Sequence, residues 1–293
     1  MNYKKILSIT TRKLSSLNSA LIDVIDIKKP SSLNYAKQLT KVISKLSPLI
    51  GNMIEFSTID MLNKLNWNGN GNWIRQDPNF PDALFKSTTI LPNPGIEIKA
   101  WFPLATEITA RFKDSITLFR ENNINMALIA WIPEHIIWGK PQIIDVLVVS
   151  GKSVAKARDI HYHNPPYYII LEPEDTSDRT ANLQQTNTNG YKLQEDKCNV
   201  SEAIKFVDTW GKTGKIYSPK FEYQQKLKKL HGEFVYRIDT NYAKIDRIQH
   251  SKIELFKNRV LNTKFYEKTI KQWNNIFNTK DDNLLESTLK TII

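Results

Sequence analysis

The sequence is poor in the residues that cross-link small folds and in long apolar runs. Of its 293 residues only Cys198 is a cysteine, which excludes an intramolecular disulfide and a cysteine-rich zinc site. No apolar run is long enough to cross a bilayer, and the N-terminal segment around Lys4 and Lys5 lacks a sustained hydrophobic stretch. We therefore expect a cytoplasmic protein that is neither secreted nor inserted in a membrane.

The composition is that of a basic globular protein. Hydrophobic residues make up 41% of the chain, enough for a sizeable core. Lysine and arginine number 41 against 30 aspartates and glutamates, which gives a formal net charge of +11. Such an excess favours polyanions, because binding releases counterions and attraction steers the encounter. Nucleic acid is the expected partner, and a basic surface that serves only solubility is the plainer alternative.

Two carboxylates and a lysine stand at a spacing typical of a phosphodiester-cleaving site. Pro81 precedes Asp82, and Glu97-Ile98-Lys99 follows after a segment, 91–95, that is dense in turn-forming residues. Because side chains alternate along a strand, Glu97 and Lys99 project to one face and their isoleucine neighbours to the other. The turn should fold the chain back into a β-hairpin that places Asp82 near Glu97.

This chemistry suits a hard divalent cation. Magnesium prefers carboxylate oxygen and keeps several waters, so Asp82, Glu97 and a substrate phosphate suffice as ligands. A lysine at position 99 would orient a water or neutralise charge that builds on the phosphate. We therefore expect Mg²⁺ as the cofactor.

Pro81-Asp82 with Glu97-Ile98-Lys99 resembles the PD-(D/E)XK nuclease signature, which most type II restriction endonucleases carry. The resemblance implies an α/β fold: a restriction-endonuclease-like core with a central mixed β-sheet flanked by helices, and helical N- and C-terminal elaborations. It also implies that Asp82 and Glu97 hold magnesium and that Lys99 is the catalytic lysine. Family members often add a glutamate from a helix before the first core strand, and Glu55 stands in the matching order.

Hydrophobic periodicity divides the chain into three regions of one elaborated domain over 1–293. Region 1–72 is a helical lead-in, with helices expected over 3–27, from the cap Ser31 or Ser32, and over 48–65, followed by a glycine-containing loop over 66–72. Region 73–175 is the catalytic core, in which a covering helix over 104–120 and two buried central strands over 126–132 and 143–149 follow the hairpin. Region 176–293 is a loop followed by mainly helical sequence, including 243–277, and is a candidate for DNA recognition.

Other chemical groups fit a site less well. Asp145 lies in an apolar strand with no second acid and lysine at metal-site spacing, so we interpret it as structural. His161 and His163 precede two prolines and are interpreted as loop histidines. Gly69 and Gly71 lack the lysine and the strand-to-helix context of a phosphate-binding loop.

Several basic residues are candidates for contact with the DNA backbone. Two lie on the expected covering helix and three in an expected basic turn after Gly151: Arg111, Lys113, Lys152, Lys156 and Arg158.

The function that these observations favour is that of a type II restriction endonuclease, which cleaves double-stranded DNA at specific sites by magnesium-dependent phosphodiester hydrolysis. The resemblance also implies a homodimer, and a cognate DNA methyltransferase as a functional partner. Two alternatives stay open: a non-catalytic DNA-binding protein on a nuclease-like scaffold, and a structure-specific DNA repair or recombination nuclease.

Overall fold

The chain forms two compact units. The computed structural model describes residues 1–76, 79–105, 108, 119, 121–163, 169–172, 191–194, 199–210, 221–222, 225–226, 229, 233, 236–238 and 248–293. A sheet unit consists of 1–109, 116–155 and 250–293, and a second unit of 110–115 and 156–249. The sheet unit thus contains both chain ends. The single domain expected over 1–293 stays a prediction.

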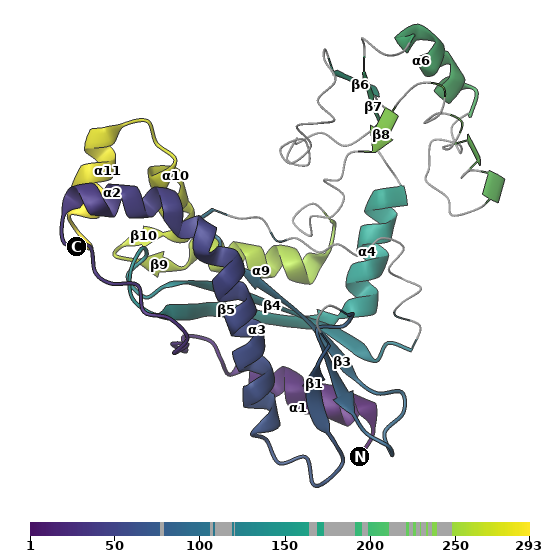
Figure 1. The fold of residues 1–293 in the computed structure, drawn as a ribbon, viewed down its shortest axis with the longest axis horizontal. Helices are drawn as coiled ribbons and strands as arrows, with labels where there is room; N and C mark the ends of the chain where they lie inside the picture. Colours follow the sequence, from purple (N-terminus) through teal and green to yellow (C-terminus); the bar gives the residue numbers. More distant parts are fainter. Residues whose placement is uncertain are drawn as a thin grey trace. The chain divides into compact units, whose positions relative to one another are not determined.

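A five-stranded mixed sheet is the centre of the sheet unit (Figure 1). Its strands, in their order across the sheet, are β1 (Asn72–Arg75), β2 (Ala83–Lys86), β3 (Gly95–Trp101), β4 (Ile124–Pro133) and β5 (Pro141–Ser150). The pair β3 and β4 is parallel, and the other three pairs are antiparallel. With helices flanking this sheet, the expected α/β class with a central mixed sheet is confirmed.

The expected hairpin is formed by β2 and β3. Ala83 lies opposite Ile96 and Leu84 opposite Gly95. A Cβ atom on Gly95 would stand 2.6 Å from Pro81 Cγ and 3.3 Å from Ile124 Cγ1, so a side chain at this position would push against the rigid proline ring. Glycine at position 95 therefore lets the segment that leads into β2 approach β3 closely.

The two apolar strands take different places in the sheet. Strand β4 is buried at every position except Asn125, as expected for a central strand. Strand β5 is the last of the five, so its predicted central position is wrong. The start of its outer edge is instead bonded by the N-terminal segment 19–22: Ile143 N donates to Ala20 O at 2.9 Å, and Ile22 N donates to Pro141 O at 2.8 Å.

Three helices precede the sheet: α1 (Tyr3–Ser15), α2 (Leu33–Val42) and α3 (Ser47–Asn63). Helix α1 ends well before the predicted residue 27, because Ser19 has a φ of 66° and the backbone after it bonds to β5. The predicted cap is confirmed for Ser32, whose hydroxyl accepts from Tyr35 N at 3.2 Å. Helix α3 begins next to Pro48, as predicted.

Helix α3 packs against β1 and β3 of the sheet (Figure 1). A Cβ atom on Gly51 would stand 3.5 Å from Ala100 Cβ, and Asn63 bonds the backbone of Trp73 through both ends of its amide. The loop after α3 contains the unusual backbone angles that its glycines predict, with φ of 71° at Gly69 and 146° at Gly71.

The C-terminal segment packs on the sheet unit. It contains α9 (Ser251–Asn262), β9 (Lys264–Phe265), β10 (Lys268–Thr269), α10 (Ile270–Phe277) and α11 (Asp282–Leu289). The expected mainly helical sequence is confirmed in this described segment, although the β9–β10 hairpin interrupts the helices at Tyr266 and Glu267, whose φ values are 46° and 64°. The ring of Phe256 on α9 lies 5.9 Å from that of Trp101.

Helix α4 (Gly151–His163) follows β5 directly. The expected basic turn after Gly151 is therefore wrong, as is the expectation that His161 and His163 lie in a loop. Ser150 favours a helix start in place of the expected turn. Its hydroxyl accepts a hydrogen bond from Ser153 N at 3.3 Å and so satisfies a free N–H of the first helical turn.

The second unit is described in fewer places. It has a three-stranded sheet of β6 (Ile169–Glu172), β7 (Tyr191–Gln194) and β8 (Tyr236–Ile238), and a helix α6 (Val200–Asp208). The predicted covering helix over 104–120 lies largely outside the described residues. The loop predicted at the start of region 176–293 is wrong where it is described, because residues 191–194 form the strand β7. Among the helices that are described, none combines the length and apolarity of a membrane span.

Candidate active site

Asp82 and Glu97 hold one another in place through the backbone of the opposite strand. Asp82 immediately precedes β2, and the antiparallel register continues to place it across from Glu97. Asp82 N donates to Glu97 Oε2 at 3.1 Å, and Ile98 N donates to Asp82 Oδ2 at 2.6 Å. Each carboxylate therefore accepts a backbone N–H from the other segment, which fixes both side chains at the same end of the hairpin.

Lys99 joins the two carboxylates. Its Nζ atom lies 3.2 Å from Asp82 Oδ2 and 2.5 Å from Glu97 Oε1. The alternation of β3 explains this arrangement, because Glu97 and Lys99 are two residues apart and share one face. The structure thus brings together the three residues that the sequence motif singled out. Their catalytic role stays a prediction.

The cluster is largely enclosed, and this changes its proton affinities. The exposed side-chain fractions are 7% for Glu97, 20% for Asp82 and 25% for Lys99. Burial raises the pKa of Glu97, and the charge of Asp82 adds to the rise, while Lys99 acts to lower it. Burial acts to lower the pKa of Lys99, but the negative charges of Glu97 and Asp82 outweigh it, so the pKa is raised. Lys99 is therefore a protonated ammonium group at neutral pH.

Glu55 lies near this cluster but has its own partner. It projects from α3, and its Oε1 atom receives Arg75 Nε at 3.0 Å. Burial raises the pKa of Glu55, and the charge of Asp82 contributes to the rise. The negative charge of Asp82 therefore disfavours ionisation of Glu55. A role for Glu55 as a third metal ligand stays a prediction.

The donor set fits a cation that needs few protein ligands. In the described part of the chain, no three acidic, histidine or cysteine side chains gather as a metal-binding group. Asp82 and Glu97 offer hard oxygens, and Asp82 Oδ1 accepts no hydrogen bond from a described residue. Two carboxylates and one ammonium leave one net negative charge. Magnesium suits such a pair, since it fills most of its coordination shell with water and phosphate oxygen.

Asp145 forms an ion pair with Arg259, apart from the cluster of Asp82, Glu97 and Lys99. Arg259 on α9 reaches it with Nε at 2.8 Å and Nη2 at 2.7 Å, and Asn18 Nδ2 lies 3.4 Å from its Oδ1 atom. Both arginine nitrogens contact the same oxygen, Oδ2, and they connect the C-terminal segment to β5. It agrees with the interpretation of Asp145 as a structural residue.

The predicted DNA-contacting residues are described only in part. Lys152 and Lys156 are exposed on α4, four residues apart and therefore on one side of the helix. Arg158 belongs to the same helix, but its side chain lies outside the described residues, as do Arg111 and Lys113. Their contact with DNA stays a prediction.

Two features of the site region were not anticipated from the sequence. One is Arg75, the partner of Glu55, which no local pattern connects with a residue 20 positions earlier. The other is a polar groove along α1 that contains Lys4 and Arg12. Helix α1 has no acidic residue in its sequence, and this one-sided charge is the signal that predicts an anion-facing surface.

Comparison of the chain with protein-family models, with curated proteins and with solved structures finds no match.

Proposed function

We propose that this protein is a magnesium-dependent endonuclease that hydrolyses phosphodiester bonds in double-stranded DNA, of the type II restriction class. The observation that carries the proposal is the convergence of Asp82, Glu97 and Lys99, with both carboxylates within 3.2 Å of one ammonium group. Two acids and a lysine of the PD-(D/E)XK pattern are thus neighbours in space, and Asp82 comes to the other two from a separate segment.

The fold adds support. The hairpin of β2 and β3 is followed by β4, which pairs with β3 in parallel, and then by β5. A hairpin followed by two further strands of one mixed sheet is the order that the family resemblance implies. A restriction-endonuclease-like core is therefore the fold we propose for the sheet unit.

In this proposal, Asp82 and Glu97 would hold the magnesium ion. The bound magnesium ion would polarise the phosphate and make a water molecule acidic near neutral pH. Lys99 acts as a charged donor, because its raised pKa keeps it protonated. It stabilises the negative charge that grows on the phosphate oxygens during attack.

The reaction is a hydrolysis in which a water oxygen attacks phosphorus opposite the 3′ oxygen. A new bond forms between the water oxygen and phosphorus, the bond from phosphorus to the 3′ oxygen breaks, and the leaving oxygen ends as a hydroxyl. The products carry a 5′ phosphate and a 3′ hydroxyl. Action on two strands as a homodimer, with a cognate DNA methyltransferase as functional partner, belongs to the same proposal.

Digestion of phage DNA with magnesium tests the proposal. We expect discrete fragments from the wild-type protein, and a loss of at least about a hundredfold in cleavage for Asp82→Asn and Lys99→Ala. Lys86→Ala is the matched control, because Lys86 is an exposed lysine on the adjacent strand and should leave cleavage unchanged.

Other outcomes distinguish the alternatives. Normal cleavage by Asp82→Asn and Lys99→Ala would refute the assigned site. Binding without cleavage in magnesium or manganese would favour a non-catalytic DNA-binding protein. Smeared or structure-dependent products would favour a repair or recombination nuclease.

A further inference from the structure

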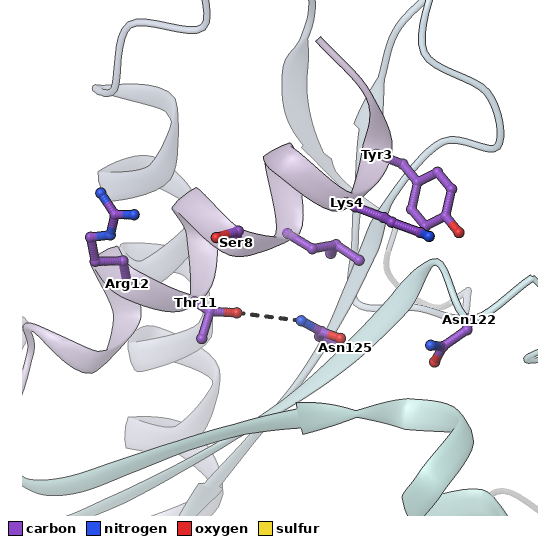
Figure 2. A pocket seen from close by; sticks show the side chains of 8 residues that line it. Tyr3, Lys4, Ser8, Thr11, Arg12, Asn122 and Asn125 are labelled. Atoms are coloured by element: carbon purple, nitrogen blue, oxygen red, sulfur yellow. Dashed lines mark hydrogen bonds between the residues drawn. The ribbon is translucent and has the colours of Figure 1, made fainter.

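A groove of about 480 Å³ runs along α1 at the start of β4, outside the candidate active site. Polar side chains dominate its lining (Figure 2): Lys4, Ser8, Thr11, Arg12, Asn122 and Asn125. Tyr3 and Leu7 complete the lining, which contains no carboxylate. The groove therefore presents positive charge and hydrogen-bonding groups with no acidic side chain among them.

The helical repeat explains why these residues share one surface. Lys4, Ser8 and Arg12 follow one another at intervals of four residues and so form one row on α1. Thr11 lies beside this row and is joined to β4 by Asn125, whose Nδ2 atom is 3.4 Å from Thr11 Oγ1 (Figure 2). The wall formed by α1 is thereby connected to the sheet.

The two cations are free to meet a ligand. Lys4 and Arg12 are exposed, and neither forms an ion pair within the described part of the chain. Asn122 Oδ1 accepts from Ser150 Oγ, which leaves the NH₂ group of Asn122 as a donor. Hydroxyl, amide and basic side chains are the groups with which proteins contact phosphate and sugar.

The spacing of the cations favours an extended anion. Eight residues of α-helix separate Lys4 from Arg12, a distance of about 12 Å along the axis. A single phosphate does not span that length, whereas one strand of a duplex presents a phosphate about every 3.4 Å of axis. We propose that this groove binds the phosphodiester backbone of DNA. The inference rests on the proposed function only for naming DNA as the nucleic acid.

The groove and the candidate active site lie near the same end of the sheet, where β3 and β4 begin. Asn125 pairs with Ile96, the residue before Glu97. Gly95 N donates to Asn123 O at 2.9 Å, and Asn123 Nδ2 donates to Asn93 O at 2.6 Å. The start of β4, which forms one wall of the groove, is thus bonded directly to the start of β3.

The test compares two double variants of α1 that remove the same charge at the same spacing. Lys4→Ala with Arg12→Ala empties the groove of cations, and Lys5→Ala with Lys13→Ala removes two lysines of the same helix that do not line it. Binding of a labelled DNA duplex is measured by fluorescence anisotropy in EDTA over a range of salt concentrations. Circular dichroism and thermal unfolding establish that both variants are folded.

The slope of log K against log salt is negative, and we expect it to be shallower by about 1.8 in the groove variant than in the wild type. Each lost phosphate contact accounts for about 0.9 of this change. Between about 50 and 200 mM salt, the wild type should then lose about twelvefold more affinity than the groove variant does. The control variant should keep the wild-type slope. An unchanged slope in the groove variant, or an equal fall in both variants, would overturn the inference.

This outcome is independent of the proposed catalysis. The assay contains no divalent metal and leaves Asp82, Glu97 and Lys99 intact. A protein that binds DNA through the groove but never cuts it would refute the endonuclease proposal alone. A protein that cuts DNA while the groove variant binds normally would refute the groove alone.

Discussion

Replacing Lys99 by methionine tests whether the carboxylate cluster is an electrostatic unit. The substitution keeps a flexible, unbranched side chain that is one atom shorter, and it removes the charge that lies 3.2 Å from Asp82 Oδ2 and 2.5 Å from Glu97 Oε1. At an effective dielectric constant of about 20, these contacts correspond to about 5 and about 7 kcal/mol before hydration is counted. Loss of hydration offsets most of this attraction.

The net effect follows from what remains after the substitution. Two enclosed carboxylates would be left without their cation, and removal of one partner from a buried pair costs about 3 to 5 kcal/mol. Because a quarter of the Lys99 side chain is exposed, we expect the lower value, a loss of about 3 kcal/mol in the free energy of unfolding at pH 7. Lys86→Met, at an exposed position of β2, should change it by less than about 0.5 kcal/mol.

The destabilisation should also depend on pH. The pKa of Glu97 is already raised above its ordinary value of 4.5, and loss of the Lys99 charge raises it further. A raised carboxyl pKa means that the folded variant takes up a proton at a higher pH than the unfolded chain does. Its deficit in stability should therefore shrink as the pH falls from 7 towards 4.5. The stabilisation by Lys99 in the wild type is fully present below pH 10.5 and is lost as the pH rises through its raised pKa.

Chemical denaturation of the wild type, Lys99→Met and Lys86→Met at several pH values measures these quantities. A second variant, Glu97→Gln with Lys99→Met, removes the repulsion and should recover part of the lost stability at pH 7. A loss below about 0.5 kcal/mol for Lys99→Met, or a loss that stays constant with pH, would show that the three side chains do not interact as described.

Two further predictions concern the support of the site and the sheet. Gly95→Ala should lower the free energy of unfolding by about 1 to 3 kcal/mol and reduce DNA cleavage, because its Cβ would stand 2.6 Å from Pro81 Cγ and displace the segment that holds Asp82. Gly69→Ala is the matched control and should leave cleavage intact, because a Cβ atom there meets nothing within 4 Å although φ is positive. Arg259→Leu should lower the free energy of unfolding by about 2 kcal/mol, since it leaves the buried Asp145 with weaker partners. Arg259→Lys should recover only part of this loss, because lysine has one nitrogen where arginine brings two to Asp145 Oδ2. Equal stability of Arg259→Leu and the wild type in urea denaturation would contradict the structural interpretation of Asp145.

The sequence predicted the proximity of Asp82, Glu97 and Lys99 because this geometry depends on residues close in the chain. Alternation along β3 places Glu97 and Lys99 on one face, and a turn over 91–95 returns the chain so that Asp82 meets them. These rules act within about 20 residues. Helix starts followed equally local signals, such as the hydroxyl of Ser32 at the cap of α2.

The errors arose where distant segments decide the structure. Segment 19–27 continues the apolar pattern of α1, but its backbone bonds instead to β5 more than a hundred residues later. The β9–β10 turn uses Tyr266 and Glu267 at positive φ, positions where glycine or asparagine is the usual signal. A helical pattern in the sequence does not reveal either outcome, because tertiary contacts outweigh local preference.

The pairing of segment 19–27 with β5 has a consequence for self-association. A free sheet edge is a template on which another chain can add a strand. The N-terminal segment occupies the start of the β5 edge, from Pro141 to Ile143, through bonds such as Ile22 N to Pro141 O, so the protein's own chain closes that part of the edge. The opposite edge is β1, only four residues long, where Arg75 is engaged with Glu55. A strand from another copy could therefore pair neither with the start of β5 nor, over more than a few residues, with β1.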